Sequence, residues 1–318
     1  MDFPQPEEQH ELAALTRKIL TGLTPQRLRE AEAGPDRFDP VLWAALGSAG
    51  VLAATLPAAA GGDGLGLLAQ CSVLTELGRA VAPVPYLPSI VLGAGALARF
   101  GSGAQQRRWA RPAAHGEFIL TAALAEEDGD DPAAPATRAE PDRAGGWRLT
   151  GVKTTVPAAP QAGLMLVPAA APEGVRVFLV SPADGGVTIE RQRLSSGESA
   201  GRVVLDAVPA GPERVLGADR VPGADEVPGA DGVAGGAAAA EWLVSAATVG
   251  LCALQAGVTE RALELTAEYA RTRTQFGKPI GGFQAVAQRL ADAHVDVAAI
   301  RLTMWQAAWR LSEGLPCG

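Results

Sequence analysis

The run GWRLTGVKTTV, residues 146–156, decides the fold class of the middle of the chain. It is rich in β-branched residues and begins at a glycine, which is the pattern of a strand. Similar short runs, each bounded by Gly, Pro or Asp, lie on both sides of it: EFILTAAL, GLMLVPAA, GVRVFLV, GVTIERQRL and AGRVVLDAV. Because no helical pattern separates these runs, residues 116–216 predict a small antiparallel β-barrel or sandwich domain.

Helical patterns flank this β domain on both sides. Apolar residues recur at helical spacing in residues 1–115, which predict an N-terminal α-helical domain. Residues 237–318 predict a C-terminal helical domain with one long helix ending near Tyr269 and a second from Gln284 to Ser312. The fold class is therefore α+β and multidomain. A two-helix hairpin leaves an apolar face uncovered, so we expect the C-terminal bundle to be truncated here or completed by another chain.

Apolar side chains mark the faces that these two helices are expected to bury. On the long helix they are Leu243, Ala247, Leu251, Leu254, Val258, Ala262, Leu265 and Tyr269. On the second helix they are Val286, Leu290, Val297, Ile300 and Met304. Between the β domain and the long helix, the unit GAD-x-V-P recurs with a period of six residues at 217, 223 and 229. Three Gly/Pro-rich copies are too few for a solenoid, so residues 217–236 predict a flexible linker.

Composition and charge narrow the function classes. The chain has 318 residues, 47% of them hydrophobic, with a net charge of −8, which argues against nonspecific nucleic-acid binding. Three distant cysteines and three scattered histidines give no disulfide framework and no metal-ligand spacing. The acidic N-terminus is not a signal peptide, and no run of about 20 apolar residues predicts a membrane span. We therefore expect a cytoplasmic protein.

The run YARTRTQFGKPIGGFQAVAQRLADAH, residues 269–294, crowds cations, glycines and amides between two helical patterns. Arg273 has the guanidinium geometry for bidentate phosphate binding, and Gln275 and Gln284 carry amides that donate hydrogen bonds. The glycine at 277 lets the backbone approach a ligand closely. A structural alternative is open at this point, in which the arginine pairs with Glu264 or Glu268 on the preceding helix.

This run closely resembles the C-terminal signature of the acyl-CoA dehydrogenase family. The resemblance extends in the same order over nearly the whole chain. Its other segments are LPAAAGGDGLGLLAQCSVLTELGRAVAPVP, RWARPAAHGEFILTAALAEEDG, GGWRLTGVKTTVPAA and GRVVLDAVPAGPERVLG. The family's three-domain fold agrees with the helix–strand–helix order expected above.

The resemblance implies FAD as cofactor and names the residues that would contact it. In the family, the Arg and Phe of R-x-Q-F-G and a later Gln contact the FAD of a neighbouring subunit. The corresponding residues here are Arg273, Phe276 and Gln284. Two segments of the β domain would also contact flavin. They are Leu124, Ala125 and Glu126, and then Thr155, Val156 and Pro157.

Both β-domain segments depart from the family pattern. The family's Thr-Glu-Pro corresponds to AEED, residues 125–128, which loses a hydroxyl and adds two carboxylates. Negative charge is unfavourable beside a dinucleotide phosphate, although backbone N–H contacts can persist. The family's Trp-Ile-Thr corresponds to Thr155, Val156 and Pro157, which lack the aromatic shield and the hydroxyl near flavin N5. Pro157 also has no N–H to donate.

The catalytic base is the least defined part of the resemblance. The chain ends before the helices that carry the family's usual catalytic Glu and its Gly-Gly FAD loop. Some members place the base on the helix before R-x-Q-F-G, where Glu241 is the candidate in this chain. It lies one residue beyond the family's position, a rotation of about 100° on a helix. The alternative is a solvated Glu in the first turn of a helix.

The leading interpretation is FAD-dependent α,β-dehydrogenation of an acyl thioester, carried by CoA or by a carrier protein. We expect a homo- or hetero-oligomer with a shared flavin site, and an electron-transfer flavoprotein is a candidate acceptor. KTTVP, residues 153–157, resembles actinobacterial-style members, some of which work as pairs of unlike subunits. A catalytically silent partner subunit is therefore the second interpretation. A flavin oxidase or monooxygenase on the same fold is the third.

Overall fold

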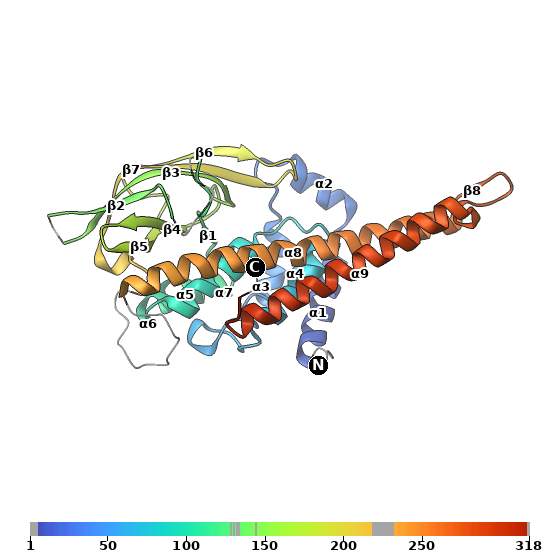
Figure 1. Cartoon of the computed structure of the whole chain (residues 1–318), viewed down its shortest axis with the longest axis horizontal. Helices are drawn as coiled ribbons and strands as arrows, with labels where there is room; N and C mark the ends of the chain where they lie inside the picture. Colours follow the sequence, from blue (N-terminus) through green and yellow to red (C-terminus); the bar gives the residue numbers. More distant parts are fainter. Residues whose placement is uncertain are drawn as a thin grey trace. The chain divides into compact units, whose positions relative to one another are not determined.

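The computed structural model describes residues 6–127, 129, 131, 134–143, 145–217 and 232–316. The order of elements is helical, then β, then helical, which confirms the predicted fold class (Figure 1). Most of the predicted linker, residues 218–231, lies outside the described residues, and so does Asp128. Helix α8 already begins at Gly232, so the last residues of the predicted linker are helical.

The elements follow the sequence patterns closely. The α-helices are α1 (Glu7–Leu20), α2 (Pro25–Ala33), α3 (Pro40–Ser48), α4 (Gly66–Arg79), α5 (Gly95–Phe100), α6 (Gly103–Gln105), α7 (Arg111–Ala114), α8 (Gly232–Thr272) and α9 (Gln284–Ser312). Short 3-10 and π-helical turns are η1 (Ala58–Ala60), η2 (Leu87–Ala94), η3 (Gln106–Ala110), η4 (Pro212–Arg214) and η5 (Ile280–Gly282). The strands are β1 (Leu120–Ala122), β2 (Arg138–Pro141), β3 (Trp147–Pro157), β4 (Leu164–Ala171), β5 (Gly174–Val180), β6 (Val187–Arg193), β7 (Ser199–Ala210), β8 (Thr274–Gln275) and β9 (Lys278–Pro279).

The chain forms two compact units, each built from separate chain segments. One unit comprises residues 1–23, 67–82 and 248–318 and is helical apart from the small β8–β9 hairpin. The other comprises residues 24–66 and 83–247 and contains the main sheet with its surrounding helices.

The main sheet is curled and mixed, with strand order β1-β4-β2-β3-β7-β6 and β5 paired to β4 (Figure 1). Four pairings are antiparallel, as the sequence predicted, while β1 and β2 each pair with β4 in parallel. Parallel pairing requires a crossover rather than a hairpin, and short strands leave no sequence signal for it. Alanine, valine and larger apolar side chains fill the core, with Leu149, Phe178 and Val203 fully buried.

In the helical unit, two glycines allow α4 and α8 to approach closely, and ion pairs link the same two helices. A Cβ atom at Gly78 of α4 would lie 2.1 Å from the carbonyl oxygen of Leu254 on α8, and one at Gly257 would lie 2.0 Å from that of Thr75. The backbones therefore touch. Arg79 at the end of α4 pairs with Glu260 at 3.2 Å and with Glu264 at 2.8 Å on α8.

The buried face of α8 differs from the prediction. Leu251, Leu265 and Tyr269 were expected to face inward, but they are exposed by 58%, 49% and 58%. The prediction is confirmed at Leu243, which is fully buried. The other buried positions are mostly small residues, among them Ala239, Ala240, Ala246, Ala253 and Ala256. Close helix contact requires small side chains, and a pattern traced through the large apolar residues follows the wrong face.

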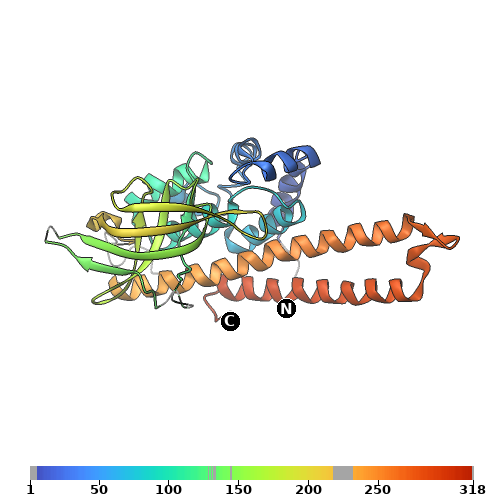
Figure 2. The same cartoon turned by 90° about the horizontal axis from the view of Figure 1, so that it is seen from above.

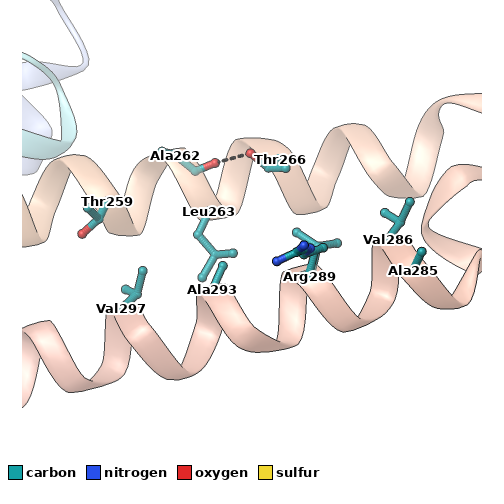
Figure 3. A pocket seen from close by; sticks show the side chains of 10 residues that line it. Thr259, Ala262, Leu263, Thr266, Ala285, Val286, Arg289, Ala293 and Val297 are labelled. Carbon is teal, nitrogen blue, oxygen red and sulfur yellow. Dashed lines mark hydrogen bonds between the residues drawn. The ribbon is translucent and has the colours of Figure 1, made fainter.

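Helices α8 and α9 run antiparallel and are joined by the β8–β9 hairpin (Figure 2). The bounds of α9 match the predicted helix, but of its predicted inward residues only Met304 is buried, and Ile300 is 36% exposed. Val286, Leu290 and Val297 instead line an apolar groove of about 540 Å³ between the two helices. Arg289 is the charged side chain in its lining (Figure 3).

Residues 235–272 of α8 are long and apolar enough to cross a membrane by length and composition, because they contain an 18-residue window with a mean hydropathy of 1.6. A core helix of a bundle passes the same test. The segment carries Glu260, Glu264 and Arg271. Both carboxylates form ion pairs with Arg79 of α4. These charges favour a bundle helix.

Candidate functional site

The structure brings together the two β-domain segments that the sequence assigned to flavin. Leu124, Ala125 and Glu126 follow β1, whereas Thr155, Val156 and Pro157 end β3. The N–H of Thr154 donates to the carbonyl oxygen of Ala125 at 2.9 Å, and Glu126 forms a β-bridge with Lys153. The six predicted residues therefore lie on two adjoining backbone segments.

The carboxylate of Glu126 is held inside the protein. Nζ of Lys153 lies 2.7 Å from Oε1 of Glu126, and the two side chains are 0% and 6% exposed. The backbone N–H groups of Ala136 and Thr137 and the Thr137 hydroxyl also donate to this carboxylate. Glu126 thus fixes the segment after it, and only its backbone is left for a cofactor.

This ion pair shifts the pKa of both partners. Burial favours the neutral acid, but the hydrogen bonds from Lys153 and Thr137 outweigh it and hold the pKa of Glu126 below its ordinary value. Burial lowers the pKa of Lys153, and the neighbouring carboxylate only partly offsets that effect. The lysine and the carboxylate lie close enough to form an ion pair inside the domain.

The extra carboxylate of Glu127 is neutralised on the surface. Nε of Arg202 on β7 lies 2.6 Å from its Oε1, and Nη1 of the same arginine lies 3.3 Å from Glu190 on β6. The hydrogen bond from Arg202 holds the pKa of Glu127 below its ordinary value. The expected charge conflict with a bound dinucleotide is thus reduced, because within the described residues each acid of this segment has a cationic partner.

Free backbone donors remain at the first segment. The N–H groups of Leu124 and Ala125 donate to no other group in the described parts of the chain. Leu124 is half-buried and Ala125 is exposed. Backbone donors of this kind suit the carbonyl oxygens and ring nitrogens of a flavin, so this segment fits the cofactor.

The second segment offers fewer donors. The N–H of Thr155 is already bound to Oε1 of Gln192 at 2.9 Å, and Val156 is paired with Gly201 in the ladder. Pro157 has no N–H, and its carbonyl oxygen accepts a hydrogen bond from the buried hydroxyl of Thr121. This segment can pack against a ring system, but it cannot supply the hydroxyl that the family places near flavin N5.

The other three predicted contacts lie on the β8–β9 hairpin and the start of α9. The turn of this hairpin has two residues, Phe276 and Gly277, with φ angles of +51° and +79°. Both central residues of such a turn need positive φ, which is unfavourable for a Phe. Phe276 is nevertheless 92% exposed, with one edge contact to Phe283 at 6.1 Å. Strain combined with exposure indicates a contact outside this chain.

Arg273 and Gln284 are also exposed, and their side chains bind no other group within the described residues. The structural alternative for Arg273 is not observed, because Glu264 pairs with Arg79 and Arg261. Glu268 forms no ion pair with Arg273 either. The guanidinium is therefore available to an external anion.

Glu241 is exposed on α8, between the buried residues Ala240 and Leu243. Within the described chain its carboxylate has no hydrogen-bond partner. A general base for α-proton removal needs a dry environment. The structure gives Glu241 no such environment, and its catalytic assignment stays a prediction.

No group of three or more potential metal ligands occurs among the described residues. Cys71 is a free, buried thiol, and burial raises its pKa to about 12. Cys252 is free and exposed. The chemistry of the site therefore depends on backbone donors, arginine and amides.

Comparison with known proteins agrees with these observations. The family model for the acyl-CoA dehydrogenase N-terminal domain matches residues 6–117, and the model for the C-terminal domain matches residues 234–318. The chain belongs to the acyl-CoA dehydrogenase family, whose matched members are flavin oxidoreductases.

Among relatives, the chain is 43% identical over 314 residues to acyl-CoA dehydrogenase FadE27 of Mycobacterium tuberculosis, covering 98% of this chain and 78% of the relative. A crystal structure described as the ChsE4-ChsE5 complex from Mycobacterium tuberculosis is similar with a TM-score of 0.89 and 42% identity, covering 98% and 80% of the two chains. A structure described as the Tcur3481-Tcur3483 steroid ACAD G363A variant has a TM-score of 0.85 and 42% identity, covering 97% and 79%.

Several residues that shape the site were not singled out from the sequence. They are Lys153, Thr137, Gln192 and Arg202. Lys153 alone carried a signal, as a charged residue inside the strand run GWRLTGVKTTV. The other three residues contact groups that are distant in the sequence. Local sequence patterns carry no information about such contacts.

Proposed function

We propose that this chain is a subunit of an FAD-dependent acyl-CoA dehydrogenase acting on an acyl thioester. The carrying observation is the juxtaposition of Leu124–Glu126 with Thr155–Pro157, in which free backbone donors adjoin carboxylates that are already neutralised. The two segments would make different contacts with the flavin. Leu124 and Ala125 would hold the flavin ring by their N–H groups, and Thr155–Pro157 would pack against it.

Arg273, Phe276 and Gln284 would contact FAD bound by a neighbouring subunit. Arg273 would neutralise phosphate charge, and Phe276 would cover an apolar part of the cofactor. The bound flavin supplies the acceptor for the hydride that leaves the β-carbon of the substrate. A carboxylate must remove the α-proton, and Glu241 is the candidate in this chain.

A catalytically silent partner subunit is the second candidate function. The second flavin segment lacks a hydroxyl and a free N–H, and Glu241 is solvent-exposed. Such a subunit would keep the fold and donate Arg273 and Gln284 to a competent neighbour. The matched structures described as a complex or a pair support assembly with an unlike subunit.

The description of one matched structure as a steroid ACAD also gives a first substrate to test. We propose that the acyl group is attached to a steroid. Free, unpaired Cys71 and Cys252 are consistent with a cytoplasmic location.

Flavin content separates the two functions. The chain would be purified alone and together with a co-expressed unlike family member, desalted, and its FAD counted per protomer from the visible absorbance. One FAD per chain with turnover of a steroid acyl thioester supports the dehydrogenase. One FAD per pair of chains, with turnover only in the pair, supports the partner subunit. Hydrogen peroxide formation in place of reduction of an artificial acceptor would instead favour an oxidase.

A further inference from the structure

Strand β3 contains a bulge within the second flavin segment. Lys153 pairs with Val203 of β7 and Val156 pairs with Gly201, so Thr154 and Thr155 both stand opposite Arg202. Two residues opposing one leave two N–H groups outside the regular ladder. Bulges of this kind are frequent beside active sites, where they redirect the chain.

Both freed N–H groups have specific acceptors. The N–H of Thr154 donates to the carbonyl oxygen of Ala125 at 2.9 Å, which ties the bulge to the first flavin segment. The N–H of Thr155 donates to the side-chain Oε1 of Gln192 at 2.9 Å. Nε2 of Gln192 also lies 3.4 Å from the hydroxyl oxygen of Thr154. One side chain thus contacts both bulge residues.

The register of the sheet explains how Gln192 reaches them. Gln192 lies on β6, at the edge of the sheet, and its partner on β7 is Ala200, which in turn pairs with Pro157 on β3. Residues paired across antiparallel strands point to the same face. Ala200 is small and fully buried, so a glutamine side chain can pass over β7 to β3.

The bulge is strained and needs this support. Thr155 is β-branched and has a φ of +48°, a conformation that such residues rarely adopt. The side chains of Thr155 and Pro157 are exposed, so packing anchors only Val156 between them and leaves the conformation of Thr155 to its hydrogen bond. Without Gln192 the N–H of Thr155 would have no acceptor, and the strand end would relax towards an extended conformation.

We propose that Gln192 is a positioning residue for the cofactor, because its amide holds the strained Thr154–Thr155 bulge in the conformation that presents residues 155–157 to the flavin. This inference rests on the proposed function. It adds a residue of the sheet edge, outside both flavin segments, to the determinants of flavin binding.

The test compares three variants of the purified chain. Gln192→Leu removes both amide contacts at similar volume. Gln192→Glu keeps an acceptor for the Thr155 N–H. Gln106→Leu is the matched control, because the Gln106 amide donates to the backbone carbonyls of Ala98 and Gly101, away from the bulge. Affinity for FAD, the visible spectrum of bound FAD and amide exchange at Thr155 in the flavin-free protein would be measured.

We expect Gln192→Leu to weaken FAD binding about tenfold, to shift the flavin spectrum and to speed exchange at Thr155 by a similar factor. Gln192→Glu should restore most of the affinity, and Gln106→Leu should match the parent in all three readouts. Parent-like affinity and spectrum in Gln192→Leu would overturn the proposal. The same variants would be measured in the chain co-expressed with an unlike family member, and if the parent binds no FAD either alone or in that pair, the proposed function fails and so does the cofactor role. Exchange at Thr155 would then separately show whether Gln192 holds the bulge.

Discussion

The two candidate flavin regions of this chain differ in how their polar groups are satisfied. Around residues 124–127 and 153–157, the side chains bind one another, and the buried Glu126 and Lys153 form an ion pair. On the β8–β9 hairpin, Arg273 and Phe276 are exposed and make few or no polar contacts. The first region is therefore shaped by its own unit, whereas the second is built for something outside it. Changes in the first should affect stability, and changes in the second should affect binding.

The largest effect is expected from breaking the buried ion pair. Lys153→Met leaves the Glu126 carboxylate buried without a cation, so the free energy of unfolding should fall by about 3 kcal/mol. The measurement is denaturant unfolding followed by circular dichroism. The double variant Lys153→Met, Glu126→Gln should regain much of the loss, because it leaves no uncompensated charge. A single variant as stable as the parent would show that the pair is not buried in solution.

Arg273→Ala tests the second region, where a substitution should affect FAD binding and leave stability unchanged. A charge-assisted hydrogen bond to phosphate should be lost, so FAD retention should weaken about 10- to 100-fold while unfolding stays unchanged. The matched control is Arg271→Ala, two residues earlier and also exposed. FAD titration and unfolding curves check both variants. Equal retention in the two would exclude the assigned role of Arg273.

The contribution of the Glu126–Lys153 ion pair to the free energy of unfolding should depend on pH in the acid range. The folded-state pKa of Glu126 lies below its ordinary value, so its contribution is fully present above about pH 5 and is lost as pH falls through the folded-state pKa. Lys153 stays protonated in acid in both states and adds no slope there. The stability difference between parent and Glu126→Gln should therefore shrink in acid. The measurement is the free energy of unfolding of both proteins at several pH values. A difference between them that stays constant with pH would contradict the prediction.

The smallest effect on stability is expected at the hairpin turn. Phe276→Asn relieves a positive φ worth about 1 kcal/mol, but it also removes the ring contact with Phe283, worth a similar amount. We expect the free energy of unfolding to change by less than about 1 kcal/mol. FAD retention should fall all the same. A variant that is more stable and retains FAD fully would show that Phe276 serves no external contact.

The sequence predicted the elements well and the contacts poorly. The bounds of α9 and the strand runs followed from periodicity, because those patterns are local. The buried face of α8 was predicted correctly at Leu243 but missed at Leu251, Leu265 and Tyr269, because alanines make most of the close contact. At the site, resemblance located residues 124–126 and 155–157. Sequence alone did not show that Lys153 and Arg202 neutralise the acids beside them, because those partners come from other strands.

The glycine contacts between α4 and α8 have a consequence for folding kinetics. Gly78 and Leu254 touch although they are roughly 180 residues apart in sequence, so their contact closes a very long loop. The helical unit is assembled from three separate segments, and its last segment emerges last from the ribosome. The sheet-containing unit has most of its residues available earlier. We expect α1 and α4 to keep apolar surface uncovered until α8 is synthesised, which favours aggregation during that interval.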